Sequence, residues 1–303
     1  LLLHHNESGI VRPAETVIVG DSLLDGSYDP GDYNTDRLAM AAVKLEWDNL
    51  RLRNVWDETV VMEWSDRARK ANRDNQRIHL GRAFGICVEK HPELLESDPE
   101  RKFKYRVVFQ GNQVADESWE SAVFRDLGSS PASQQAGKFA DFYGALRGHA
   151  CEQGDANQAY VQAVLTGLET WVALPPEAWP AEWYNEDGSA KYDRPVVRLL
   201  RALYGHPDAG TCWEEKCDRV MKEKGFVAIE CWPSCYFHPE LKTLMVVYVD
   251  DFKNAGPDTN LDRAWGLVKD ELEIEKTRVV SGCSCEKWAT KTVGGQNVNV
   301  VTY

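Results

Sequence analysis

The stretch Leu244-Met245-Val246-Val247-Tyr248-Val249-Asp250-Asp251 ends an apolar run with two adjacent carboxylates. Polar residues and a glycine follow it. This pattern predicts a buried strand that runs into a tight turn, with the aspartates at the turn. Carboxylates placed in this way bind hard divalent cations, and such cations drive phosphoryl transfer. Asp-Asp is also an ordinary turn dipeptide, because Asp side chains bond their own backbone. The pair alone therefore does not separate the two interpretations.

Composition and charge indicate a globular chain with one basic stretch. Its 303 residues are 43% hydrophobic and 27% charged, enough for one large or two modest domains. The net charge of −13 argues against a generic nucleic-acid-binding protein. Residues 65–107, however, carry eleven Lys/Arg against seven Asp/Glu, a net of +4, and the remainder carries −17. A locally basic lobe binds a phosphate backbone, although an ordinary solvated surface explains the charge equally well.

The cysteines and the hydropathy pattern suggest an intracellular protein without a membrane partner. Eight cysteines occur with no Cys-x-x-Cys pair, and the sequence shows no secretory signal, so reduced thiols are expected. Cys231, Cys235 and His238 only loosely suggest zinc, since the spacing is unusual and a fourth ligand is missing. No apolar run approaches the ~20 residues needed to span a bilayer. Because the chain begins with Leu1, we expect it to be a piece of a longer chain.

The residue pattern predicts an α+β fold, because helices and hairpins outnumber strand-helix-strand crossovers. Residues 1–35 are predicted to form a tail or linker. Helices are expected over 36–56, 66–75, 133–149, 208–224 and 261–272. Strands are expected over 78–89, 103–110, 151–155, 196–200, 226–229, 234–237 and 244–249, the first two forming a hairpin.

A metal-dependent phosphoryl transferase needs a further carboxylate from another strand. Asp155 is the best candidate, because it lies at the end of a short strand-like segment. The alternative is that Asp155 caps a turn or a helix.

Five stretches follow one another along the chain in an informative order: Lys104-Tyr105-Arg106-Val107-Val108, Ser130-Pro131, Asp155-Ala156-Asn157-Gln158-Ala159-Tyr160, Leu200-Arg201-Ala202-Leu203-Tyr204-Gly205 and the Tyr-Val-Asp-Asp box at 248–251. In this order they resemble the reverse transcriptase region of copia-type long-terminal-repeat retrotransposons. Trp213 falls where that family places a Trp. The resemblance covers roughly residues 38–290, and the box is its one specific motif.

The resemblance implies a right-hand polymerase with an antiparallel palm sheet packed on helices. Fingers would span 36–115, the palm 116–275, and a palm edge or truncated thumb 276–303. The implied activity is RNA-directed DNA synthesis, in which two Mg²⁺ (or Mn²⁺) ions promote transfer from a deoxynucleoside triphosphate to a primer 3′-hydroxyl on an RNA or DNA template.

The resemblance also assigns site residues. Asp155, Asp250 and Asp251 would hold the metal ions. Because adjacent strand side chains point to opposite faces, we expect Asp250 to be the stronger ligand and Asp251 to have an outer role. The residues implied in nucleotide binding are Lys104, Arg106, Tyr160, Tyr204 and Gly205, and those implied in primer binding are Tyr248 and Gly282. A solvated strand face at Lys104 and Arg106, and a core aromatic at Tyr160, are the alternatives.

Departures from the family pattern keep a second hypothesis open. After Gly205 the family usually has a segment that supplies a lysine, whereas this chain has His206-Pro207-Asp208-Ala209-Gly210. The family often has a basic residue at the position of Gln110. A catalytically inactive remnant, acting at most as a nucleic-acid-binding or structural module, fits these changes. A metal-dependent nuclease is a weaker alternative, because no His or Lys accompanies the carboxylates. The resemblance places the protein in the cytoplasm, within a virus-like particle, or in the nucleus, and leaves its oligomeric state open.

Overall fold

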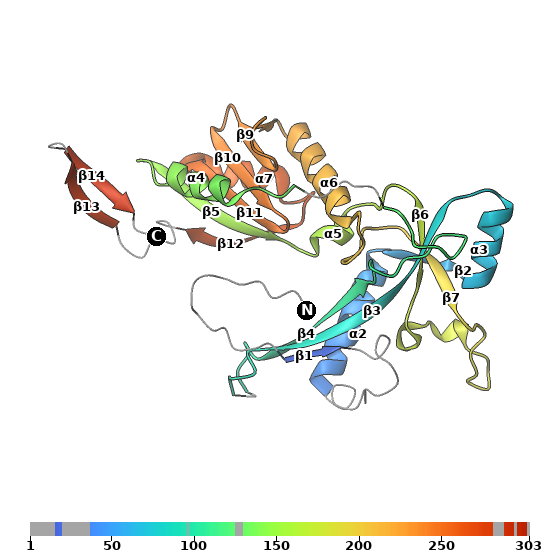
Figure 1. Cartoon of the computed structure of the whole chain (residues 1–303). Helices are drawn as coiled ribbons and strands as arrows, with labels where there is room; N and C mark the ends of the chain where they lie inside the picture. Colours follow the sequence, from blue (N-terminus) through green and yellow to red (C-terminus); the bar gives the residue numbers. More distant parts are fainter. Residues whose placement is uncertain are drawn as a thin grey trace. The chain divides into compact units, whose positions relative to one another are not determined.

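The computed structural model describes residues 16–19, 37–95, 97–124, 130–280, 288–293 and 296–301, with side-chain environments described between 37 and 275 (Figure 1). The chain divides into two compact units. The first unit holds residues 1–122 and 168–206, and the second unit holds 123–167 and 207–303. The sequence-based division placed 168–206 with the following palm segment, whereas the structure groups these residues with the first unit.

The described residues of the first unit form a six-stranded sheet and two helices. Its strand order is β1 (Thr16–Val19), β3 (Ile78–Lys90), β6 (Glu169–Ala173), β7 (Pro195–Leu199) and β2 (Trp56–Glu63), and β4 (Lys102–Phe109) also pairs with β3. The helices are α2 (Arg37–Leu52) and α3 (Trp64–Arg73), with short 3-10 turns at Pro176–Ala178 and Ala181–Trp183. The parallel pairing of β6 with β3 joins segments about ninety residues apart, which makes this unit discontinuous in sequence.

Where the second unit is described, it forms a six-stranded antiparallel sheet with helices on both faces. Its strand order is β12 (Ile274–Val280), β5 (His149–Ala156), β11 (Asp251–Pro257), β10 (Thr243–Tyr248), β9 (Cys235–His238) and β8 (Val227–Ala228). Its helices are α4 (Gln134–Gly144), α5 (Ala159–Gln162), α6 (Ala209–Glu223) and α7 (Asp258–Val268). The series β5, α6, β10, β11, α7, β12 follows the β-α-β-β-α-β order of a split β-α-β motif. A separate hairpin joins β13 (Trp288–Val293) to β14 (Gln296–Val301).

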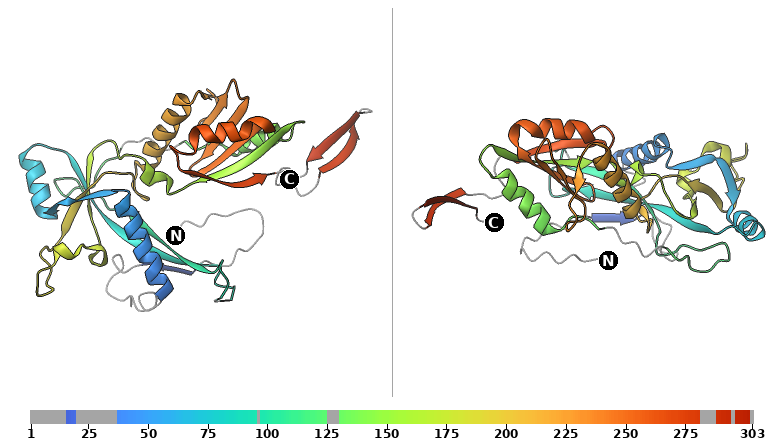
Figure 2. Two further views of the ribbon diagram at one scale, coloured as in Figure 1. Left: turned by 180° about the vertical axis from the view of Figure 1, so that it is seen from behind. Right: turned by 90° about the horizontal axis from the view of Figure 1, so that it is seen from above.

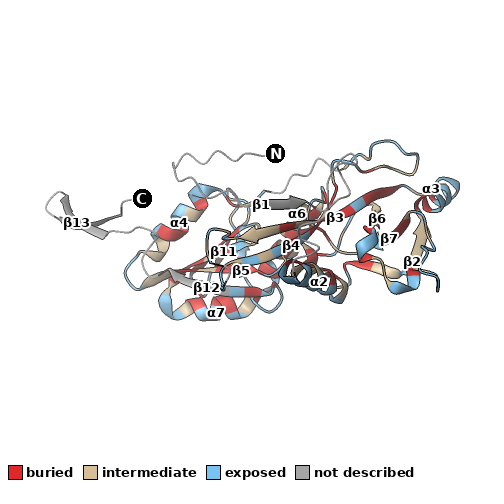
Figure 3. Ribbon diagram, turned by 90° about the horizontal axis from the view of Figure 1, so that it is seen from below, coloured by how far each residue is buried: buried red, intermediate tan, exposed pale blue. Residues whose placement is uncertain are grey.

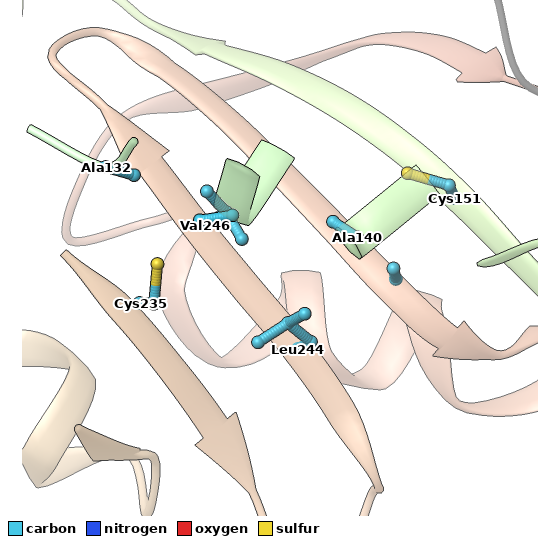
Figure 4. Close-up of a cluster of buried hydrophobic side chains, with 8 residues drawn as sticks. Ala132, Ala140, Cys151, Cys235, Leu244 and Val246 are labelled. Atoms are coloured by element: carbon cyan, nitrogen blue, oxygen red, sulfur yellow. The ribbon is translucent and has the colours of Figure 1, made fainter. Parts of the chain in front are cut away.

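Alternation along the strands decides which helix covers which face of this sheet. Small residues of α4, Ala136 and Ala140, pack against side chains of β5, β9, β10 and β11 that include Cys151, Cys235 and Val246 (Figure 4). The neighbouring positions point the other way, where Trp213 of α6 meets Phe252. Helix α4 therefore lies on one face of the sheet, and α7 lies on the opposite face, as the two opposed views of Figures 1 and 2 show.

The α+β class predicted from the sequence is confirmed. The predicted helices correspond to α2, α3, α4, α6 and α7, and the hairpin of β3 and β4 forms as expected. No helix in the described part of the chain is both long and apolar enough to cross a bilayer.

Several details of the prediction are wrong. Part of the expected tail forms β1, which pairs with β3. Helix α2, which was predicted only by its range, is buried along one side (Figure 3). Ala39, Trp47 and Leu50 supply its packed face, whereas Leu38, Leu45 and Leu52 are exposed. Strands β2, β6 and β11 were not predicted, since polar and small residues interrupt their alternation.

Candidate functional site

The Tyr-Val-Asp-Asp box forms the turn of the β10–β11 hairpin. Tyr248 pairs with Asp251, so Val249 and Asp250 are the two residues of the loop. Val249 has φ 57°, in the left-handed region that β-branched residues rarely adopt. This conformation costs about 1–2 kcal/mol for an L-residue. The turn therefore persists only because the surrounding structure holds it.

The structure places Asp155 beside this turn. In the β5–β11 ladder Asp251 lies directly opposite Asp155, and the Ala156 N–H donates to the Asp250 carbonyl at 2.8 Å. Opposed residues in a ladder project to the same face, so Asp155 and Asp251 share the α4 face of the sheet. The three aspartates thus lie at one end of the sheet, two on facing strands and one in the turn. Asp251 is thus the direct neighbour of Asp155. The outer role that we expected for Asp251 did not anticipate this position.

The surroundings of Asp251 disfavour the ionised form of its carboxyl group. The pKa of Asp251 is raised, first by partial burial and then by the negative charges of Asp250 and Asp155. Asp155 and Asp251 are nevertheless exposed at the surface of the unit, and Asp250 is half-buried. A ligand therefore has access to this concentration of negative charge.

The donor chemistry fits a hard divalent cation, since carboxylate oxygens are the ligands that Mg²⁺ and Mn²⁺ prefer. Within the described residues, however, no three His, Cys, Asp or Glu side chains are gathered closely enough to form a metal-binding group. The aspartates therefore concentrate negative charge without forming a closed cage.

A cavity of about 550 Å³ opens on the α4 face next to these aspartates. Asp251, Tyr248 and Lys253 line it from the hairpin, together with Ser133, Gln134 and Gln153. The Lys253 ammonium forms an ion pair with Asp141 of α4 at 2.8 Å. The sequence reasoning missed Lys253, although its spacing of two residues from Asp251 on one strand places both on the same face.

The opposite side of the turn faces α5 and α6. Tyr160 of α5 is half-buried, and its pKa is raised by burial and then by the charges of Asp250 and Glu214. Burial also raises the pKa of Glu214, against the effect of a hydrogen bond from the Ser130 backbone N–H. Glu214 is thus a further acid near the turn that no sequence motif had indicated. The Trp213 indole N–H donates to the Val249 carbonyl at 2.7 Å.

The predicted nucleotide-binding cations lie in the first unit. Lys104 and Arg106 are exposed on one face of β4 and line a pocket of about 200 Å³ with Tyr204. Apolar residues of β3 and β4 complete the pocket, together with Lys90.

Gly205 is tied to the end of β4. It has φ 84°, and a Cβ at this position would lie 2.2 Å from the Phe109 carbonyl oxygen. The preceding Tyr204 carbonyl accepts a hydrogen bond from the Phe109 N–H at 2.6 Å. Only glycine fits this close approach, which explains why Gly205 follows Tyr204.

The predicted site residues therefore fall into two groups. Lys104, Arg106, Tyr204 and Gly205 belong to the first unit, whereas Asp155, Tyr160, Tyr248, Asp250 and Asp251 belong to the second. Gly282 lies outside the described residues.

No family model matches the chain, and no curated protein matches it at a significant level.

The raised pKa of Asp251 predicts the pH dependence of stability. A carboxyl whose folded pKa is raised contributes stability at low pH that is lost as the pH rises through that pKa. Asp251→Asn, which mimics the neutral acid, should therefore raise the free energy of unfolding at pH 7 and should have no effect below about pH 4, near the ordinary pKa of Asp. Urea denaturation across this range measures the difference. Asp270→Asn, at an exposed position of the same unit, is the control. A gain at pH 7 that is equal in both variants would contradict the assignment.

Proposed function

We propose that this chain is the reverse transcriptase region of a copia-type retrotransposon, an RNA-directed DNA polymerase. The observation that carries the proposal is the register of β5 and β11, which puts Asp155 opposite Asp251 with Asp250 in the adjoining turn. The two acidic segments are almost a hundred residues apart in sequence, and nothing in local composition requires them to meet. Their meeting at one end of one sheet supports the role that the resemblance implies.

The architecture of the second unit is also consistent with a polymerase palm. Its antiparallel sheet is packed on helices, as the resemblance implies, and the aspartates lie at the open end of one sheet face. The cavity beside Tyr248 and Asp251 leaves space on that face for a primer end. We assign this unit as the palm and the basic hairpin of the first unit as part of the fingers.

The chain's own residues have separable roles in the proposed reaction. Asp155 and Asp251 would hold Mg²⁺ from facing strands, and Asp250 would hold it from the turn. Bound Mg²⁺ would lower the pKa of the primer 3′-hydroxyl and stabilise the charge of the leaving pyrophosphate. Tyr160, half-buried beside the turn, would contact the sugar of the incoming nucleotide. Lys104 and Arg106 would bind the triphosphate, because an ammonium and a guanidinium on one strand face offer several charged donors to phosphate oxygens.

An inactive remnant remains the second candidate. Two observations favour it: the acidic and proline-containing segment after Gly205, and the lack of a closed metal-binding group among the described residues. This candidate predicts salt-dependent binding to a primer–template without incorporation of nucleotides.

Primer extension separates the two candidates. On a poly(rA) template with an oligo(dT) primer, dTTP and Mg²⁺, we expect the wild-type chain to extend the primer. Asp155→Asn and Asp250→Asn should each lower the rate by about a hundredfold or more, because a carboxylate ligand of the ions is lost. Asp270→Asn should leave the rate unchanged. Equal incorporation by the wild type and the Asp250 variant would contradict the mechanism.

The assignment of the basic pocket predicts a different kinetic effect. Lys104→Ala and Arg106→Ala should each raise the KM for dTTP about tenfold. Removing one hydrogen bond to a charged group usually weakens binding by about this factor. Lys102 is exposed on the same strand but does not line the pocket, so Lys102→Ala is the matched control. A steady-state titration with dTTP measures all three variants. If Lys102→Ala raises the KM as much as the others, the effect reflects general charge and the pocket has no specific role.

A further inference from the structure

We propose that Trp213 is a positioning residue that holds the Asp250 turn in its working conformation. The inference rests on the proposed function, since it assumes that Asp250 contributes to a cation site. Trp213 itself reaches no reacting group and acts through the backbone of the turn. The position of its indole relative to Val249 carries the argument.

Both central carbonyls of the turn accept a hydrogen bond, from donors on different elements. The Trp213 indole N–H of α6 donates to the Val249 carbonyl at 2.7 Å. The Ala156 N–H of β5 donates to the Asp250 carbonyl at 2.8 Å. The first bond fixes the peptide that precedes Asp250, and the second links Asp250 to the residue after Asp155. The orientation of the turn relative to Asp155 therefore depends on both donors.

The turn needs such a restraint because Val249 has a positive φ of 57°. A β-branched residue relaxes readily from this region to negative φ. Relaxation would rotate the peptide between Val249 and Asp250 and move the Asp250 carboxylate away from Asp155. The bond to Trp213 opposes this rotation directly, since its acceptor is the carbonyl of that peptide.

The indole is itself held rigidly. Trp213 is almost fully buried at 1% exposure, and its ring meets Phe252, the residue after Asp251, edge-on at 6.4 Å. Val249, Trp213 and Tyr160 line a space of only about 10 Å³. This volume is at the lower limit for one water molecule, so in the wild type the indole N–H, not water, serves the Val249 carbonyl. Removing the indole N–H takes away the donor that is fixed to α6.

The test compares Trp213→Phe with a matched control, Trp265→Phe. Trp265 is also buried in the second unit, and its indole N–H donates at 2.8 Å to Glu152, away from the turn. Mn²⁺ affinity is measured by titration with electron paramagnetic resonance, and kcat and KM for dTTP by primer extension. Trp213→Phe should bind Mn²⁺ about tenfold more weakly and lower kcat more than it changes KM, because the ligand geometry is loosened. Trp265→Phe should lower the Tm but keep the Mn²⁺ affinity within about twofold.

A double-mutant cycle with Val249→Gly tests the strain itself. Glycine tolerates positive φ without cost, so the turn should depend less on the indole. In the Val249→Gly background we expect Trp213→Phe to weaken Mn²⁺ binding by about threefold or less. An equal loss in both backgrounds, or an unchanged Mn²⁺ affinity in Trp213→Phe, would overturn the proposal.

A measurement on the wild type covers the case in which Trp213→Phe does not fold. Addition of Mg²⁺ should shift the indole N–H resonance of Trp213 and slow its hydrogen exchange, while the Trp265 resonance stays unchanged. Equal responses of the two indoles would overturn the positioning role. If the wild type extends primers and Trp213→Phe extends them equally well, this inference alone is refuted. A wild type that neither binds Mn²⁺ nor extends primers refutes the proposed function, and the positioning role with it.

Discussion

The antiparallel pairing of β5 with β11 is the constraint on which the candidate site depends. It sets Asp251 opposite Asp155 and ties the Asp250 carbonyl to the Ala156 N–H. A shift of one residue in this register would send Asp155 and Asp251 to opposite faces of the sheet. The small residues of α4 on one face and the packing of Trp213 against Phe252 on the other resist such a shift. The core of the second unit thus determines the position of its acidic residues.

This arrangement is costly for the folded chain. Three carboxylates lie near one another, and the pKa of Asp251 is raised by its partial burial and then by the charges of Asp250 and Asp155. Val249 adds backbone strain in the same turn. Proteins accept such local costs mainly at functional sites, where charge or strain serves binding or catalysis. A bound divalent cation would offset the electrostatic part of the cost, which is one reason to interpret the cluster as a cation site.

Much of the second unit could be predicted from the sequence because its signals are local. The apolar run ending at Tyr248 predicted β10, and the helix predicted over 208–224 corresponds closely to α6. Asp155 was identified from its place after a short strand and from the family resemblance. The pairing of Asp155 with Asp251 could not be derived, since a register depends on contacts between distant segments.

Other features depend on tertiary structure and were missed for that reason. The segment carrying β6 and β7 joins the first unit because β6 pairs in parallel with β3, and no local pattern indicates this. The face of α4 that packs on the sheet consists of the small residues Ala136 and Ala140, whereas the larger Phe139 is exposed, because the close approach of α4 to the sheet favours alanine. The contact of Trp213 with the turn left no signal beyond the resemblance, because a hydrogen bond from a side chain to a backbone carbonyl leaves no spacing pattern.

The most direct test of the central claim is a crystal structure of the chain grown or soaked with Mn²⁺, with anomalous scattering recorded for the metal. We predict an anomalous peak between the carboxylates of Asp155 and Asp251 and within reach of Asp250, and the loss of that peak in Asp155→Asn. An ordered hairpin without a peak at this end of the sheet, or a peak that persists in Asp155→Asn, would contradict the assignment of these aspartates as a cation site.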